Sequence, residues 1–281
     1  MSRKKSSGSG DATLSGVETA IPKKIHQIYF GDDLSERLKA NARELRDLNP
    51  SWEYALYDAH TGEDYIRTHY GADVLQAYHH LDPRYYAARA DLLRYLIVYR
   101  EGGVYLDIKS RFDGPIDKFI RGDEGFVLSQ WRNGTGEIHE GFGIYRDIAF
   151  VPCGEFQNFH VIGAAKHPFL NAVIEAVLRN INAYAPWHAV GRTGVVRVTG
   201  PVAYTRAIFP LLELFPHKRV RHEGEIGLQY SIPEAYDPDP VRGGHYSAVS
   251  DPLVRMSAPG KIASGLFAKL RSLGASARRR S

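Results

Sequence analysis

The stretch from residue 84 to residue 107 constrains the fold more than any other part of the chain. Residues 84–100 read RYYAARADLLRYLIVYR, and their apolar side chains recur at helical spacing without an internal Gly or Pro. Gly102-Gly103 ends this predicted helix, and we expect left-handed backbone there because Gly tolerates positive φ. The strand VYLD follows at once. A long helix must therefore fold back beside a short buried strand.

The rest of the chain alternates between strand and helix patterns. Short apolar runs predict strands at residues 25–30, 52–58 and 126–131. Amphipathic patterns predict helices at residues 35–48, behind a Ser35 cap, and 167–184, with helical pieces between 62 and 78. This alternation predicts an α/β domain in which helices cover both faces of one sheet and ligands bind at the carboxyl ends of its strands.

Composition excludes several classes of protein. The 281 residues are 43% hydrophobic and 24% charged, as in globular proteins, and much of the net charge of +4 lies at the two ends. The central part is close to neutral, so we expect no nucleic-acid partner. Cys153 is the single cysteine, and no apolar run approaches the ~20 residues of a membrane span. We therefore expect a cytoplasmic protein, with a peripheral membrane association left open.

Asp107 is the first candidate for chemistry, because it ends its predicted strand where side chains of an α/β sheet meet a ligand. A strand-end Asp that only caps a turn is the structural alternative. Arg89, Asp91 and Arg94 lie on the preceding helix, and the spacing of Asp91 and Arg94 puts them on one face beside that strand. Two residues beyond Asp107, where a metal site would need a second carboxylate, the chain has Lys109.

The block ARADLLRYLIVYREGGVYLDI, with IPKKIHQIYFGD and NPSWEYALYD before it, resembles a known family. It is similar to the DXD-containing glycosyltransferases of family 32, the capsular-polysaccharide and yeast mannosyltransferase type, and to their relatives, the large clostridial glucosylating toxins. The resemblance covers about residues 21 to 210. It implies a GT-A fold, a Rossmann-like mixed sheet, that binds a nucleotide-sugar and transfers the sugar with retention of configuration.

The resemblance also implies roles for individual residues. Tyr29 stands where an aromatic side chain stacks on the nucleotide base. Asp91 and Arg94 match the pair that binds the hydroxyls of the donor sugar, and Arg89 is grouped with them as substrate-binding. Tyr105, which precedes Asp107 on the strand, matches a residue that touches sugar, ribose and diphosphate, a role that Asp107 shares.

Later segments carry the resemblance further along the chain. Asn158, in QNFHVIGAAKHPFL, matches a residue near the anomeric carbon, and Thr199-Gly200-Pro201 matches the start of a helix whose amides face the ligand. The carboxyl-terminal signature of the family survives as GGHYSAVSDP, with His245 and Ser250 as substrate-binding candidates but without its Trp.

Lys109 in place of the second Asp leaves the metal open. A departing nucleoside diphosphate needs a preorganised positive charge, which Mn²⁺ or Mg²⁺ supplies when two carboxylates hold it. An ammonium group can contact phosphate oxygens directly, so a metal-sparing site with Asp107, Asn158 and Lys109 as catalytic residues is one reading. A weaker metal site, with Asp107, His245 or Asp113 as ligands, is the other.

The sequence thus predicts a disordered leader at residues 1–20, a single GT-A domain at 21–255 and a basic amphipathic tail at 256–281. The expected reaction moves a hexose from a UDP- or GDP-sugar to a glycan or glycolipid hydroxyl. The rivals are a non-catalytic relative that binds a nucleotide-sugar or glycan, and an adaptor that works through its basic ends. In the tail, apolar residues share one side of a predicted helix with Lys and Arg beside them, which fits a membrane surface or docking on the domain itself.

Overall fold

The computed structural model describes residues 18–232, 247 and 249–278. The leader predicted at residues 1–20 therefore lies largely outside the described residues, as does His245. None of the described helices combines the length and the apolarity that crossing a bilayer requires.

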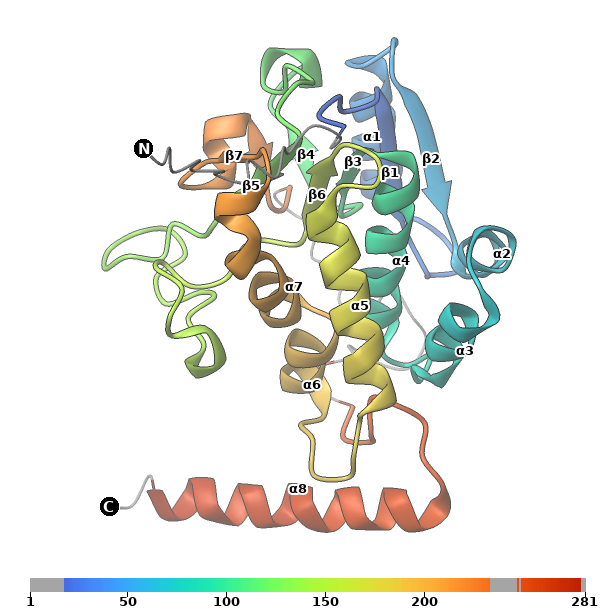
Figure 1. Cartoon of the computed structure of the whole chain (residues 1–281), viewed down its shortest axis with the longest axis vertical. Helices are drawn as coiled ribbons and strands as arrows, with labels where there is room; N and C mark the ends of the chain where they lie inside the picture. The colour runs from blue at the N-terminus through green and yellow to red at the C-terminus, as the bar shows by residue number, and fades with distance from the viewer. Residues whose placement is uncertain (1–17, 233–246, 248, 279–281) are drawn as a thin grey trace, which may run out of the picture.

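A six-stranded mixed sheet forms the centre of the molecule (Figure 1). The order of its strands is β2 (Glu53–Tyr57), β1 (Lys24–Ile28), β3 (Gly103–Leu106), β6 (His160–Gly163), β5 (Phe126–Leu128) and β7 (Lys218–Arg219). Strands β2, β1 and β3 are mutually parallel, whereas β6 runs antiparallel to both β3 and β5. A separate pair joins β4 (Arg111–Phe112) to β8 (Leu228–Gln229). The predicted mixed α/β architecture is confirmed.

Helices cover both faces of this sheet. The helices are α1 (Glu36–Asp47), α2 (Ala59–His69), α3 (Ala72–His80), α4 (Tyr86–Glu101), α5 (Pro168–Asn182), α6 (Gly191–Val198), α7 (Pro201–Ile208) and α8 (Ala258–Arg278). Strand β3 shows the two layers, because Tyr105 packs into the core of α4, α5 and α7 while its neighbours Val104 and Leu106 pack into the core that includes Leu45 of α1. Each side chain of β3 is thus buried on one face or the other.

The turn between α4 and β3 depends on two glycines. Gly102 has φ 66° and Gly103 has φ 96°, so both adopt positive φ as expected. The ψ of −166° at Gly102 corrects the expectation of left-handed helical backbone, because this combination belongs to a region that only Gly readily occupies. A Cβ on Gly102 would also lie 2.6 Å from Cδ of Pro22 and 2.8 Å from the backbone nitrogen of Ala165. The helix therefore reverses into the strand in a space that admits no side chain.

Several elements differ from the expected ones. Strand β6 was not expected, because its four residues HVIG are buried throughout and show no alternation of apolar and polar residues. Strand β5 ends at Leu128, before the polar Ser129 and Gln130, although the expected strand continues to Trp131. Helix α2 begins at Ala59, earlier than expected, because Asp58 and Thr61 form a capping box. Helix α1 begins after Ser35, whose hydroxyl accepts a hydrogen bond from the Leu38 amide, as expected.

Candidate active site

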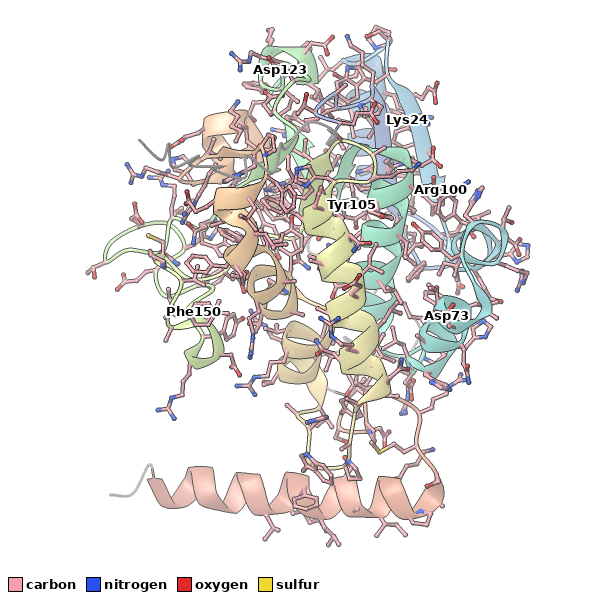
Figure 2. All side chains as sticks on the ribbon, in the orientation of Figure 1. Lys24, Asp73, Arg100, Tyr105, Asp123 and Phe150 are labelled. Atoms are coloured by element: carbon pink, nitrogen blue, oxygen red, sulfur yellow. The ribbon has the colours of Figure 1, made fainter. Side chains whose placement is uncertain are left out.

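The candidate site lies where β3 ends. The amide of Asp107 donates a hydrogen bond to the carbonyl of Phe159, so the chain leaves the sheet against the residue before β6. Helix α4 runs back along β3 and brings Asp91 and Arg94 to the same level as Asp107. Figure 2 places Tyr105 in the interior of the molecule, and its side chain is 1% exposed. Two elements adjacent in sequence thus supply the acidic and basic groups of the site.

Arg94 is the hub of this cluster. Its Nη1 lies 3.2 Å from Oδ1 of Asp107 and donates to the carbonyl of Asn158 at 2.6 Å, while Nη2 lies 3.5 Å from Oδ1 of Asp91. The guanidinium stacks over the ring of Tyr105 at 4.6 Å from the centroid. Burial opposes its charge, but the neighbouring Tyr105, Asp107 and Asp91 together raise the pKa of Arg94. Arg94 therefore stays charged and fixes the positions of both carboxylates.

Asp91 is almost fully buried, with 5% of its surface exposed. Its Oδ1 accepts a hydrogen bond from Nδ2 of Asn158 at 3.1 Å, and its Oδ2 accepts one from the hydroxyl of Thr199 at 2.9 Å. Burial raises the pKa of Asp91 to about 6, against the opposing influence of Arg94 and these hydrogen bonds. Asp91 thus connects α4 to Asn158 and Thr199. These contacts give it a positioning role in the site, and its contact with a donor sugar stays a prediction.

Asn158 and Tyr105 complete the group. The Nδ2 of Asn158 also donates to the hydroxyl of Tyr95 at 2.8 Å, and the hydroxyl of Tyr105 donates to Oδ1 of Asp107 at 2.8 Å. Both contacts of Asp107, with Tyr105 and with Arg94, use Oδ1, and the side chain is 25% exposed. Asp107 is therefore held in one orientation while Oδ2 keeps its capacity to accept a further hydrogen bond.

Arg94→Lys should destabilise the fold by about 1–2 kcal/mol, because Lys keeps the charge but loses the planar fork that contacts Asp107 and Asn158 together and stacks on Tyr105. Thermal unfolding would measure the change. Arg100→Lys is the matched control, since Arg100 lies on the same helix with 48% of its side chain exposed. Equal melting temperatures for both variants would contradict the role of Arg94 as the hub.

Lys109 lies beside the cluster and does not pair directly with Asp107. Its Nζ donates to the hydroxyl of Tyr230 at 3.0 Å and lies 4.3 Å from the centroid of that ring. Burial opposes the charge of Lys109, but Tyr230 and Asp107 raise its pKa, so the ammonium form is retained. The carbonyl of Lys109 accepts a hydrogen bond from the amide of Ile232, so Lys109 is held through its backbone as well as its side chain.

The other predicted site residues fall in different places. Tyr29 follows β1, whose residue His26 pairs with Tyr105 of β3, so Tyr29 leaves the sheet at the same edge as Asp107. Its hydroxyl donates to the carbonyl of Asp33. Arg89 is not brought into the cluster, because its guanidinium donates to the carbonyl of Leu81 and stacks over Tyr78. The substrate-binding roles of Tyr29 and Arg89 stay predictions.

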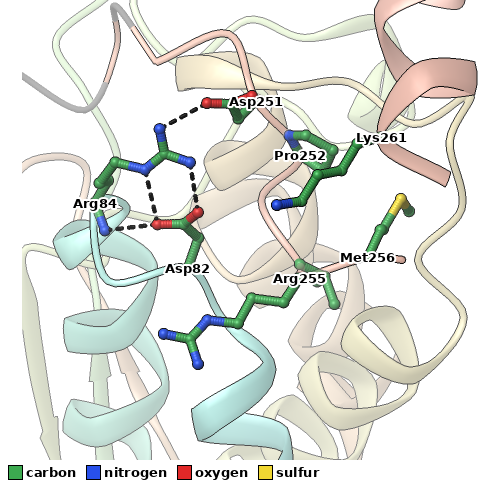
Figure 3. A pocket seen from close by; sticks show the side chains of 8 residues that line it. Asp82, Arg84, Asp251, Pro252, Arg255, Met256 and Lys261 are labelled. Carbon is green, nitrogen blue, oxygen red and sulfur yellow. Dashed lines mark hydrogen bonds and ion pairs between the residues drawn. The ribbon is translucent and has the colours of Figure 1, made fainter. Parts of the chain in front are cut away.

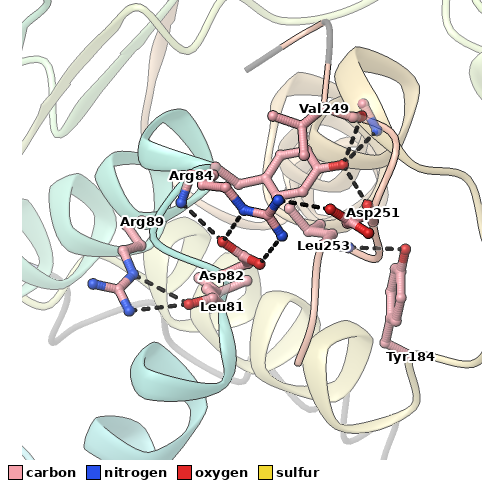
Figure 4. A network of polar contacts seen from close by, with 10 residues as sticks. Leu81, Asp82, Arg84, Arg89, Tyr184, Val249, Asp251 and Leu253 are labelled. Carbon is pink, nitrogen blue, oxygen red and sulfur yellow. Dashed lines mark hydrogen bonds and ion pairs between the residues drawn. The ribbon is translucent and has the colours of Figure 1, made fainter. Parts of the chain in front are cut away.

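Ser250 is exposed and lies in a segment bound to the start of α4, not to the Asp107 cluster. Its neighbours Val249 and Asp251 accept hydrogen bonds from the hydroxyl of Tyr85 through their carbonyls (Figure 4). His245, the other residue of that signature, lies outside the described residues, so its role also stays a prediction.

A divalent cation does not fit the donors that the structure describes. No group of three His, Cys, Asp or Glu side chains lies close enough to hold a metal within the described residues. Asp91 uses both oxygens for Asn158 and Thr199, which leaves Asp107 as one carboxylate between two cationic side chains. Mg²⁺ and Mn²⁺ need several oxygen ligands, and neighbouring cations repel them. Of the two other predicted ligands, Asp113 accepts a hydrogen bond from Gln229, and His245 lies outside the described residues.

An aromatic cluster next to Lys109 escaped the sequence analysis. Tyr230 packs edge-on against Trp131 at 5.0 Å and against Phe159 at 5.0 Å between ring centroids. His139 and Phe142, from the glycine-rich loop at residues 131–143, also pack edge-on against Trp131. The loop is therefore connected to Lys109 through two aromatic rings. No local sequence pattern predicts these contacts, because the residues come from distant parts of the chain.

Glu155 lies behind this cluster and was also missed. It is 5% exposed, and its Oε1 accepts a hydrogen bond from Nε1 of Trp131 at 2.7 Å. Its Oε2 is buried and has no hydrogen-bond partner among the described residues. Burial raises the pKa of Glu155 to about 7, although Trp131 and Arg192 act in the opposite direction. Burial therefore opposes the ionisation of Glu155, whereas the hydrogen bond from Trp131 favours it.

Glu155→Gln should flatten the dependence of stability on pH. The folded pKa is higher than the unfolded one, so the wild type should lose stability as pH rises from about 4.5 to about 7. Above about pH 7 the free energy of unfolding of Glu155→Gln should exceed that of the wild type by about 3 kcal/mol at most. Melting temperatures across this range would test it, with exposed Glu213→Gln as the control. Parallel profiles for the wild type and Glu155→Gln would show that the carboxyl is not buried in solution.

The segment that holds this site is similar in sequence to known proteins. Residues 35–125 match the family model described as the glycosyltransferase sugar-binding region containing the DXD motif, a segment that includes Asp91, Arg94, Tyr105, Asp107 and Lys109. The chain is 27% identical to inositol phosphoceramide mannosyltransferase 3 of Schizosaccharomyces pombe, over 79% of this chain and 53% of that protein. It is 29% identical to the mannosyl phosphorylinositol ceramide synthase CSH1 of Saccharomyces cerevisiae, over 66% of this chain and 48% of that protein. The chain spans about half the length of these curated relatives.

A solved structure supports the fold. The UDP-bound glycosyltransferase domain from the YGT toxin superposes with a TM-score of 0.51 and 11% identity, over 78% of this chain and 82% of that domain. This likeness confirms the GT-A type of fold that the sequence predicted. The resemblance inferred from the sequence is confirmed as well: the chain is similar to the mannosyltransferases named above, and its residues 35–125 match the DXD-containing glycosyltransferase sugar-binding region.

Proposed function

We propose that this protein is a glycosyltransferase that moves a hexose from a UDP- or GDP-sugar to a hydroxyl of a glycan or glycolipid, with retention of configuration. The observation that carries the proposal is the cluster at the end of β3, where Arg94 holds Asp107, Asp91 and the backbone of Asn158 in fixed positions. The family match over residues 35–125, which include Asp91, Arg94 and Asp107, and the glycosyltransferase relatives support the reaction class.

We further propose that Lys109 supplies positive charge that a metal ion supplies elsewhere. Two Asp side chains with one divalent cation sum to zero charge, and Asp107 with Lys109 also sums to zero. The diphosphate of a bound donor would thus meet a comparable local charge in either arrangement. The ammonium is held by Tyr230 before the donor arrives, so little reorganisation is needed when charge develops on the leaving group.

The remaining residues of the cluster have positioning roles in this proposal. Asn158 is oriented by Asp91 and Tyr95 and is half-buried, which suits a residue near the anomeric carbon. Tyr105 and Arg94 keep Asp107 in one orientation, so that Oδ2 can accept a hydrogen bond from a donor hydroxyl. A lipid-linked acceptor is supported by the relatives named as inositol phosphoceramide mannosyltransferases.

A thermal-shift panel of UDP, GDP, CMP and their sugars, each with and without Mn²⁺, tests the proposal. A ligand that binds only the native state raises the melting temperature, so one nucleotide series should stabilise the protein without metal. Release of nucleoside diphosphate from the same donor would then establish turnover. Stabilisation without turnover, with glycan and glycolipid acceptors present, would favour the non-catalytic binding relative. No shift with any nucleotide would refute the proposal.

A further inference from the structure

Helix α8 presents an exposed apolar side to solvent. Ile262, Leu266 and Leu270 are 67%, 58% and 63% exposed and follow one another at intervals of four residues, which aligns them along the helix. Phe267 is 40% exposed beside them. Scattered exposed apolar residues are ordinary, but a contiguous row on one helix marks an interaction surface.

A second segment contributes to the same surface. Trp187, in the loop between α5 and α6, is 60% exposed, and its ring packs edge-on against Phe267 at 6.3 Å between centroids. This loop reaches α8 at the bottom of Figure 1, and Figure 2 shows side chains of α8 pointing away from the domain. We name Trp187, Ile262, Leu266, Phe267 and Leu270 the α8 face. Trp combines an apolar ring with a polar N–H, which suits the boundary between lipid and water.

The helix is fixed to the domain at its start. Arg84 forms ion pairs with Asp82 and Asp251, and Tyr85 donates its hydroxyl to the carbonyls of Val249 and Asp251 (Figure 4). Leu81 and Val254 then form an antiparallel bridge just before α8 begins. Within the helix, Ser264 is 1% exposed, so the side opposite the α8 face packs inward. The α8 face is therefore held in one orientation on the domain.

The helix that carries this face is basic in sequence. Helix α8 contains no Asp or Glu, whereas it carries Lys261, Lys269, Arg271 and Arg278. Lys261 and Arg255 also line a pocket of about 230 Å³ at the start of the helix, where Arg84 pairs with the two acidic residues of the lining (Figure 3). The other lining residues form no ion pair with Lys261 or Arg255 among the residues drawn there. An apolar face beside basic side chains complements a surface that is apolar inside and negative outside.

We propose that the α8 face binds the surface of an anionic lipid bilayer. Its apolar side chains would enter the boundary between headgroups and acyl chains, and the basic residues would contact lipid phosphates. Strands β1, β2 and β3 are parallel, and β2 points toward the half of the molecule that holds α8 (Figure 1). If the proposed function holds, this orientation turns the Asp107 edge of the sheet toward a membrane-borne acceptor.

Co-sedimentation of the full chain with vesicles tests this proposal without any measurement of turnover. The wild type should bind vesicles of phosphatidylcholine and phosphatidylglycerol in equal parts, bind phosphatidylcholine alone more weakly, and dissociate as salt is raised. The double change Leu266→Ser and Leu270→Ser should lower the partition coefficient tenfold or more, because two leucines no longer enter the lipid. The changes lie at exposed positions, so unaltered melting temperatures are expected.

The matched control is the double change Ile138→Ser and Leu214→Ser, which removes equally exposed apolar side chains outside the α8 face. This variant should sediment with vesicles like the wild type. Lys261→Gln should keep the weaker binding to phosphatidylcholine but reduce the preference for phosphatidylglycerol. Equal binding by both Ser variants would overturn the proposal, as would wild-type failure to bind either vesicle. Self-association of the wild type that only Leu266→Ser disrupts, without vesicle binding, would assign the α8 face to a second copy instead.

Discussion

Lys109→Ala is expected to lower kcat for donor turnover by ~10²-fold or more, about 2.7 kcal/mol, the usual scale for losing one preorganised charge-stabilising group. The ammonium is held by Tyr230 and stays charged beside Asp107, so its removal leaves the developing charge of the diphosphate without a fixed counter-charge. Steady-state release of nucleoside diphosphate measures the effect. Lys39→Ala is the control, because Lys39 lies on α1 with 42% of its side chain exposed, and this variant should retain wild-type kcat.

Lys109→Asp sharpens this test. It restores the Asp-x-Asp spacing, so it should recover activity only when Mn²⁺ is added, since two carboxylates can bind a divalent ion. The wild type should gain nothing from Mn²⁺. If Lys109→Ala turned over donor like the wild type, the lysine would be a structural partner of Tyr230 and nothing more.

Asp107→Asn should lower donor turnover on the order of 10³-fold, about 4 kcal/mol, while the fold survives. Asn preserves the volume and the hydrogen bond from Tyr105, but it removes the negative charge that Arg94 and Lys109 face. The Asp107 side chain is 25% exposed, and Arg94 keeps its contacts with Asp91 and with the carbonyl of Asn158 in the variant. The melting temperature should therefore change little.

Asp113→Asn is the matched control, because Asp113 also follows a strand directly, at the end of β4. It should keep wild-type turnover. A large loss of stability in Asp107→Asn with unchanged turnover would make Asp107 a structural turn residue and would remove the basis of the proposed reaction.

Local patterns predicted most of the fold. The helix of residues 84–100 and the strand after it were predictable because helical periodicity and a Gly-Gly break are local signals. Strand β6 was not, because a short strand buried on both faces shows no alternation. Its antiparallel placement between β3 and β5 depends on contacts between distant segments, which local periodicity does not report.

The candidate site also contains some residues that the sequence could predict and others that it could not. Asp91, Arg94, Tyr105 and Asp107 were predictable because one helix–turn–strand unit brings them together. Tyr230 could not be found, since it lies 121 residues from Lys109 along the chain. Glu155 gave no signal either, because only the folded structure buries its carboxyl behind Trp131. Arg89 was grouped with the site residues because it shares their helix, but its side chain donates a hydrogen bond to the carbonyl of Leu81 instead of joining the cluster.

Turnover by the wild-type protein in the presence of EDTA tests the central claim most directly. If Lys109 supplies the positive charge against the diphosphate, kcat should be the same with EDTA, without EDTA and with added Mn²⁺. Activity that EDTA abolishes and Mn²⁺ restores would contradict the account, because a metal ion would then supply the charge assigned to Lys109.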